Sequence, residues 1–160
     1  MTTTRIFLNS LVFLLLATPQ VLAASSSGLP IPRFVSLKND EANVRTGPGT
    51  RYPIQWVYRR QGMPVEIIEE YDLWRKIRDE EGTSGWVHKS MLDGKRNVTI
   101  KGKEPCILRA DSSEEAKPVM KAAPMVIGQL VECQQLWCRV QINGKKGWLQ
   151  KAHLWGVYER

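Results

Sequence analysis

Residues 43–49 read Asn43-Val44-Arg45-Thr46-Gly47-Pro48-Gly49, and Gly85-Trp86-Val87 follows further along the chain. The second half carries matching landmarks, Ile107-Leu108-Arg109 and Gly147-Trp148-Leu149. The two arginines are 64 residues apart and the two Gly-Trp pairs are 62 residues apart. Self-similarity that keeps its register over a whole unit indicates a duplicated domain.

Each copy divides into short extended runs separated by turn-forming residues. Gly47-Pro48-Gly49, Gln61-Gly62 and Gly82 interrupt the first copy, and Asn143-Gly144 gives a strong hairpin signal in the second. No segment shows a sustained helical period. Short strands at regular spacing predict an all-β fold of two tandem small β-barrels with five to six strands each, over residues 33–95 and 98–160.

These residues resemble the bacterial SH3 domain family. The resemblance is carried by residues 43–49, by the strand that bears Trp74 and by Gly85-Trp86-Val87. The Cys133 to Cys138 segment, Gly147-Trp148-Leu149 and residues 154–158 are similar to the divergent second copy of exported tandem proteins in that family, although residues 110–114 lack the glycines of the first loop. The resemblance implies two SH3-like β-barrels that recognise cell-wall peptide or glycan. The Ala-Leu-Tyr-Asp-Tyr signature of eukaryotic SH3 domains is absent, so we expect no binding of proline-rich peptides.

The first 23 residues have the pattern of a signal peptide. Arg5 precedes an apolar run that ends before Pro19, and small or short residues before the cut predict cleavage after Ala23. An uncleaved membrane anchor is the alternative, but polar residues and Pro19 interrupt the roughly 20 apolar residues that it needs. Residues 24–32, rich in serine and proline, are expected to form a flexible leader. We therefore expect a periplasmic or secreted protein with no membrane span after cleavage.

The chain is mildly basic. Cleavage after Ala23 removes Arg5 and leaves 22 basic and 16 acidic residues, a net charge of +6 spread over both copies. This excess fits attraction to an anionic envelope polymer or simply a soluble surface, and it lacks the clustered cations of a nucleic-acid-binding face. Nucleic acid is therefore excluded as an expected partner.

Strand alternation places tryptophans away from the barrel centres. Ile77 marks the core face of its strand, so Trp74 points the other way, and Val87 likewise leaves Trp86 pointing outward. One interpretation is an aromatic ligand platform in the first copy; its predicted ligand-binding residues are Arg45, Tyr52, Trp56, Tyr71, Trp74 and Trp86. The alternative is a second layer of core in which the glycine of each Gly-Trp pair allows close backbone approach. Residues 155–158 have no counterpart in the first copy and close either the second barrel or the junction between the barrels.

The recurring arginine and the cysteines suggest internal roles. Arg45 and Arg109 either form a ligand-binding pair or, because their loops differ, hydrogen-bond a turn. Aligning the tryptophan strands places Cys133 over Glu70 and Cys138 over Arg75, on one side of adjoining strands. We predict a Cys133–Cys138 disulfide; pairing of Cys106 with either cysteine is the alternative.

No catalytic or metal-binding pattern is recognisable. His88 and His153 are the only histidines, and neither lies in a cysteine-hydrolase context. We expect no cofactor, no metal and no enzymatic activity. The sequence therefore predicts a non-catalytic exported module that binds cell-wall peptide, glycan or an envelope protein, with the first copy favoured as the binding copy. The alternative is a structural protein whose aromatic faces pack the barrels together or mediate oligomerisation.

Overall fold

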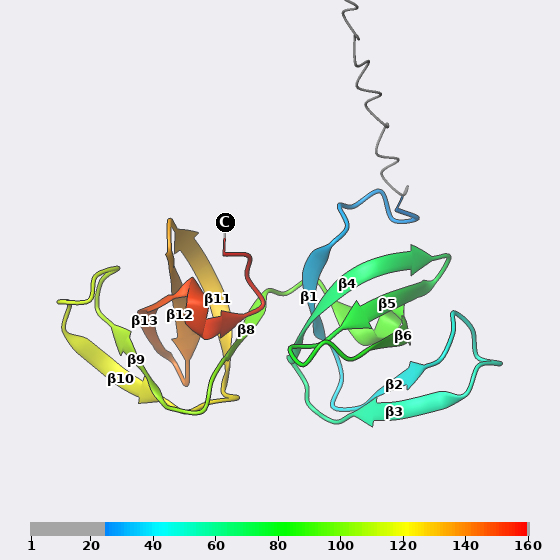
Figure 1. Ribbon diagram of the computed structural model, residues 1–160, viewed down its shortest axis with the longest axis horizontal. Helices are drawn as coiled ribbons and strands as arrows, with labels where there is room; N and C mark the ends of the chain where they lie inside the picture. Colours follow the sequence, from blue (N-terminus) through cyan, green and yellow to red (C-terminus); the bar gives the residue numbers. More distant parts are fainter. Residues whose placement is uncertain (1–24, 160) are drawn as a thin grey trace, which may run out of the picture.

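The computed structural model describes residues 25–159, so the predicted signal peptide and its cleavage after Ala23 lie outside the described residues. The described chain is all-β, and it forms two units that lie side by side (Figure 1). The first unit contains β1 (Arg33–Leu37), β2 (Ala42–Arg45), β3 (Ile54–Tyr58), β4 (Pro64–Tyr71), β5 (Trp74–Arg78), β6 (Ser84–His88), the 3-10 helix η1 (Lys89–Met91) and β7 (Leu92–Asp93).

The second unit repeats this order. It contains β8 (Asn97–Ile100), β9 (Cys106–Arg109), β10 (Pro118–Ala122), β11 (Ile127–Gln134), β12 (Trp137–Ile142), β13 (Lys145–Gln150), the 3-10 helix η2 (Lys151–His153) and β14 (Leu154–Trp155). The antiparallel sheets have the orders β3-β2-β6-β5-β4-β1-β7 and β10-β9-β13-β12-β11-β8-β14. The all-β duplicated fold is confirmed. Each unit exceeds the expected five to six strands because a two-residue strand after the 3-10 helix pairs with the unit's first strand.

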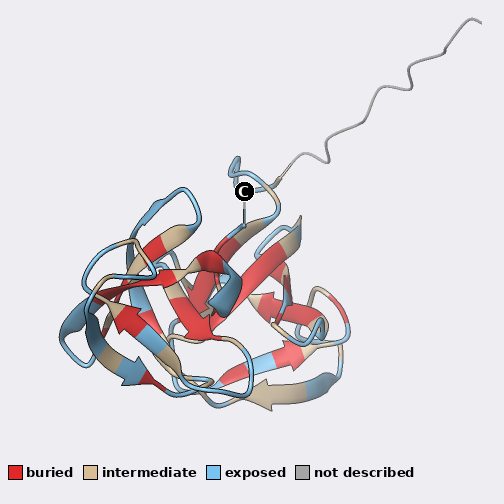
Figure 2. Cartoon of the chain, turned by 60° about the vertical axis from the view of Figure 1, so that its left-hand side comes forward, coloured by how far each residue is buried: buried red, intermediate tan, exposed pale blue. Residues whose placement is uncertain are grey.

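Each unit has its own hydrophobic core, built from alternate strand positions. Val44, Val65, Ile77 and Val87 are buried together in the first unit, and Leu108, Val140 and Leu149 are among their counterparts in the second. Figure 2 shows the buried residues along the strands and the exposed ones mainly in the loops. The alternation correctly assigned Ile77 and Val87 to the core face.

Residues 155–158 contribute both to the junction between the units, through Trp155 and Tyr158, and to the core of the second unit, through Val157. The Phe34 ring of β1 meets the Trp155 ring edge-on, with centroids 5.0 Å apart, and the Tyr158 ring at 4.9 Å. Trp155 Nε1 donates to the carbonyl oxygen of Pro64 at 3.0 Å, and the Tyr158 hydroxyl donates to Glu66 Oε1 at 3.0 Å. The barrels are therefore packed together by aromatic residues, but by these three rather than by the repeated tryptophans.

Polar contacts of the inter-unit segment complete the junction. Arg96 Nη2 donates to the Gly156 carbonyl at 2.8 Å, and Asn97 Nδ2 donates to the Gly62 carbonyl at 2.9 Å. Gly156 has φ +111°, and a Cβ there would lie 2.5 Å from the Asn97 carbonyl oxygen. Glycine is needed at this position for both its backbone conformation and its close approach.

The leader is anchored to the first unit at its described end. Glu70 Oε2 accepts hydrogen bonds from Ser25 Oγ at 2.7 Å and from the Ser27 backbone nitrogen at 2.8 Å, and Glu70 also pairs with Arg33. Residues 25–27 are thus hydrogen-bonded to β4, a contact that the flexible-leader prediction did not contain.

The predicted Cys133–Cys138 disulfide is confirmed. The two cysteines stand opposite each other in the β11–β12 hairpin and are bonded, while Cys106 is free. Among residues 25–159, no helix is long and apolar enough to cross a membrane.

A repeated groove as candidate binding site

Arg45 and Arg109 each brace the hairpin loop that follows them. Arg45 Nη1 donates to the carbonyl oxygens of Tyr52 at 2.7 Å and Thr50 at 3.1 Å. Arg109 Nη1 donates to the carbonyl of Ala116 at 3.0 Å. Both arginines therefore make the hydrogen bonds to a turn that their recurrence in the two copies suggested, although the two loops differ in sequence. Whether Arg45 also contacts a ligand stays a prediction.

A groove of about 460 Å³ lies beside Arg109 in the second unit. It runs between the loop that joins β8 to β9, the first residue of β12, and the end of β13 with η2. Its walls include Ile107, Arg109, Glu114, Trp137, Gln150 and His153. Three cations, Lys101, Lys103 and Arg109, face two carboxylates, Glu104 and Glu114, so the groove is weakly cationic.

The first unit has a smaller groove of about 200 Å³ at the same place. Six of its lining residues are Asn43, Arg45, Thr50, Trp74, His88 and Met91. At the repeat offsets of 64, 63 and 62 residues, these six positions correspond to the six groove residues of the second unit named above. Both copies therefore build one groove from the same positions, with an arginine and a tryptophan in common.

The first groove has its own local chemistry. The His88 ring stands edge-on to Trp74, with ring centroids 5.5 Å apart, and His88 Nδ1 lies 2.7 Å from Ser90 Oγ. The same His88 nitrogen accepts from the Ser90 backbone nitrogen and so caps η1. The His88 ring is thus held in place by Trp74 and by Ser90, and its polar edge lies next to the half-buried indole of Trp74.

Only Arg45 and Trp74 of the six predicted ligand-binding residues line the first groove. Trp86 is buried outside the core cluster, as is its counterpart in the second unit, which fits the alternative of a second core layer. Trp56 packs against the core, and its indole nitrogen is buried without a partner. Tyr71 is 62% exposed at the end of β4. The ligand roles of all six stay predictions.

Gly47 and Gly85 each allow a close contact that a side chain at the same position would block. A Cβ on Gly47 would be 2.5 Å from the Tyr52 ring, so the ring packs directly on the Gly-Pro-Gly loop. A Cβ on Gly85 would be 2.4 Å from Val44 Cγ1 and 3.2 Å from the Arg45 carbonyl oxygen. The close backbone approach predicted for Gly85 is present.

Most residues of the groove, including those of its larger copy in the second unit, were not among the predicted ligand-binding residues. Asn43, Thr50, His88 and Met91 carry no conspicuous motif of their own. The repeat offsets pair each of these four residues with a residue of the second unit, and this pairing could have been made from the sequence. It would not have shown that loop 101–105 widens the second groove.

Cys106 lines the second groove as a free thiol. Burial raises the pKa of Cys106, which keeps the thiol protonated. Activated nucleophilic cysteines have a lowered pKa instead. Within residues 25–159, no group of three or more His, Cys, Asp or Glu residues is placed to hold a metal ion.

Comparison with known proteins identifies the two units. The family model described as the bacterial SH3 domain matches residues 38–94 and residues 102–156. A curated relative from Bacillus subtilis (strain 168), named "Putative N-acetylmuramoyl-L-alanine amidase YrvJ", is 23% identical over 148 residues, which is 82% of this chain. The chain spans 28% of the length of that relative.

Solved structures with some likeness include two proteins named for NlpC. NlpC2 from Trichomonas vaginalis is 10% identical with a TM-score of 0.37, over 79% of this chain and 49% of that one. An NlpC/P60 family protein from Bacillus cereus is 16% identical with a TM-score of 0.34, over 76% and 55%. Both TM-scores lie below 0.5 and support no functional comparison.

Proposed function

Because this chain belongs to the bacterial SH3 domain family, we propose that it is a non-catalytic exported binding module that recognises cell-wall (peptidoglycan) peptide through the repeated groove. Bacterial SH3 domains are typically cell-wall binding modules. The observation that carries the proposal is the conservation of one groove between two copies, with six corresponding positions, despite different loops.

The chemistry of the second groove suits a short peptide with free carboxylates. Trp137 offers a flat apolar surface, and Lys101 and Lys103 supply cations at the rim. Arg109 is already paired with Glu114 at 3.4 Å and bonded to a loop carbonyl, so the two lysines are the cations more available to an incoming carboxylate. The larger groove volume favours the second unit as the main binding copy, whereas the sequence pattern favoured the first copy.

The non-catalytic part of the proposal is supported by the state of the candidate nucleophiles. Cys106 has a pKa raised by burial, and Cys133 and Cys138 are joined in the disulfide. The Ser90–His88 pair caps η1, and no contact of the described chain places a carboxylate on the His88 ring. A serine–histidine nucleophile needs such a third group to orient the base.

Export to the periplasm or outside the cell belongs to the same proposal. A disulfide persists in oxidising compartments, and the family is consistent with an extracytoplasmic location. The predicted signal peptide would provide the route.

The test is a titration of the protein with soluble peptide fragments from purified cell wall, followed by tryptophan fluorescence and calorimetry. We expect saturable binding that Trp137→Ala weakens by at least about tenfold, a loss of about 1.4 kcal/mol. Leu136→Ala, a change at an exposed neighbour outside the groove, should leave affinity unchanged. Equal affinity of Trp137→Ala and the unchanged protein would rule out the groove of the second unit, and release of products from the cell-wall fragments would rule out the non-catalytic role.

A structural role is the second candidate, and the aromatic junction favours it. Phe34, Trp155 and Tyr158 already pack the two units together. In this case, cell-wall fragments would not bind. The protein would instead retain envelope proteins in a pull-down that is insensitive to Trp137→Ala and Trp74→Ala.

A further inference from the structure

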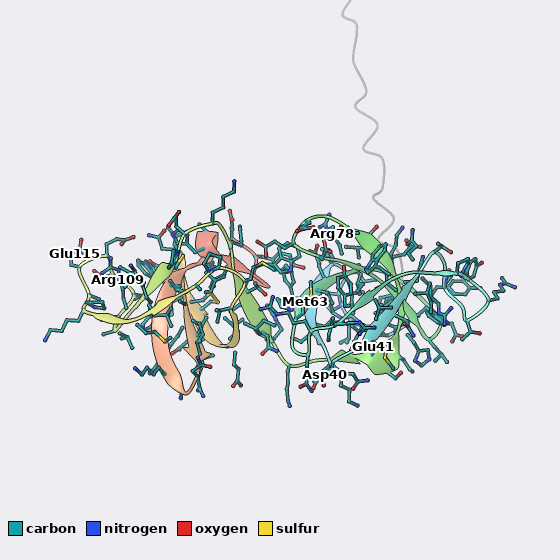
Figure 3. All side chains as sticks on the ribbon, turned by 90° about the horizontal axis from the view of Figure 1, so that it is seen from below. Asp40, Glu41, Met63, Arg78, Arg109 and Glu115 are labelled. Atoms are coloured by element: carbon teal, nitrogen blue, oxygen red, sulfur yellow. A yellow bond between two sulfur atoms is a disulfide. The ribbon has the colours of Figure 1, made fainter. Side chains whose placement is uncertain are left out.

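A further cavity lies at the junction of the two units and is separate from both grooves. Its volume is about 180 Å³, and it shares no lining residue with either groove. Tyr58, Met63 and the loop that joins β5 to β6 form the side of the first unit, and Thr99, Met125 and Trp155 form the side of the second. Figure 3 shows Met63 on the side of the first unit that faces the second.

Thr99 brings an unused hydroxyl to this cavity. On β8 the neighbours Val98 and Ile100 are buried in the core of the second unit, so the Thr99 side chain points the opposite way, toward the junction. The residue is only 4% exposed, and its hydroxyl makes no hydrogen bond within residues 25–159. A hydroxyl that lines a cavity and has no protein partner is available to accept a hydrogen bond from a ligand.

The first unit brings three carboxylates to the same cavity: Asp79, Glu80 and Glu81. Asp79 is fully engaged, because it accepts from the Tyr58 hydroxyl at 2.7 Å and from two backbone nitrogens of its loop. Glu80 is partly buried and has no hydrogen bond or ion pair within the described chain. Burial raises the pKa of Glu80, against the attraction of Lys101.

The remaining walls are aromatic and aliphatic. The rings of Tyr58 and Trp155 and the thioethers of Met63 and Met125 line the cavity. Such walls accept methylene groups, and aromatic faces attract cations. Arg60 is the one cation among the lining residues, and its guanidinium is engaged by the Met125 carbonyl. Lys101 is also near, and it pairs with Glu159 at 3.7 Å. Three carboxylates thus outnumber two engaged cations.

We propose that this junction pocket binds an alkylammonium group, such as the side chain of a lysine or one end of a diamine. Glu80 and Thr99 accept hydrogen bonds from the ammonium group, and the rings and thioethers surround its methylene chain. The ligand contacts both units at once, so its binding also stabilises their mutual arrangement. The proposal does not depend on the groove or on cell-wall recognition.

The experiment is an NMR titration of the whole protein with Nα-acetyl-lysine methylamide, and with the norleucine analogue that replaces the ammonium group by a methyl group. We expect a saturable shift of the Trp155 indole N–H with the lysine probe, and at least about tenfold weaker binding of the norleucine probe. Saturable shifts confined to Trp74 or Trp137, which line the grooves, would overturn the assignment to the junction.

Two variants test the polar contacts. Glu80→Gln should weaken binding of the lysine probe by about tenfold, because it removes the negative charge that faces the ammonium group, and Thr99→Val by severalfold, because it removes an acceptor. The matched control is Glu115→Gln, which removes an exposed carboxylate at the far end of the second unit (Figure 3). Unchanged affinity in Glu80→Gln, equal affinity for both probes, or absence of saturation up to the solubility of the lysine probe would each overturn the proposal.

Discussion

Glu70 and Arg75 face each other across the β4–β5 hairpin, with Arg75 Nε 3.1 Å from Glu70 Oε1. In the second unit the equivalent residues, 63 positions later, are Cys133 and Cys138, and they face each other in the same register. One unit closes this hairpin with an ion pair and the other with a covalent bond. The same strand positions therefore serve the same structural purpose through different chemistry.

Replacing both Cys133 and Cys138 by serine should destabilise the second unit by about 2 kcal/mol. The bond closes only a short loop, so loop-closure entropy limits its contribution to this value. Urea unfolding of the oxidised protein and of the double variant measures the difference. Cys106→Ser, which removes the free thiol, should change the unfolding free energy much less. An equal effect of the two changes would contradict this account.

Glu70→Gln should destabilise the first unit by about 2–3 kcal/mol at neutral pH, because Arg33 and Arg75 lose the negative charge of their buried partner. Burial alone would raise the pKa of Glu70, but hydrogen bonds from Ser25, Arg33 and Ser27 outweigh it and hold the pKa well below its usual range. A lowered pKa in the folded state means that this stabilisation is present above the unfolded pKa of about 4.5 and is lost as pH falls.

The stability difference between the unchanged protein and Glu70→Gln should therefore shrink as pH is lowered below about 4.5. Thermal unfolding at a series of pH values measures it. Glu69→Gln is the matched control, since Glu69 is an exposed neighbour whose carboxylate pairs with Lys76 at 3.3 Å, and it should show little effect. A difference that stays constant down to acid pH would show that Glu70 acts through packing instead.

Gly85→Ala and Gly147→Ala should each cost about 1–3 kcal/mol through overpacking. A Cβ on Gly147 would lie 2.8 Å from Leu108 Cβ and 3.1 Å from the Arg109 carbonyl oxygen, and Gly85 is equally crowded. Gly94→Ala is the control, because no heavy atom lies within 4 Å of a Cβ there. Chemical unfolding ranks the three variants, and equal stability of Gly147→Ala and Gly94→Ala would contradict the close approach.

Repetition made much of the fold predictable from sequence. Strand parity around Ile77 and Val87 identified the core face, and comparison of Glu70 with Cys133 identified the disulfide, because both depend on local alternation. The grooves and the junction depend on contacts between distant segments. Residues such as Thr99 and Glu80 lie in unremarkable sequence, and only the packing of one unit against the other brings them to one cavity. The roles of residues 155–158 stayed open for the same reason.

Trp155→Ala should loosen the junction without unfolding either unit. The change removes the hydrogen bond to the Pro64 carbonyl and the edge-on contact with Phe34, while the core of each unit contains neither of these interactions. We expect a loss of about 2 kcal/mol, below the range for a fully buried tryptophan, because Trp155 is only half-buried. Backbone ¹⁵N relaxation should then give shorter and unequal rotational correlation times for the two units.

Tyr71→Ala provides the comparison, since it removes an exposed aromatic ring that is not among the junction contacts named above and should leave a single correlation time. Binding of the lysine probe to the junction pocket is a second measurement on Trp155→Ala, because Trp155 forms one wall of that pocket. If the units tumble together in Trp155→Ala, the remaining contacts of Tyr158, Arg96 and Asn97 are sufficient to hold the junction. Independent tumbling would instead identify the aromatic contacts as the main source of rigidity.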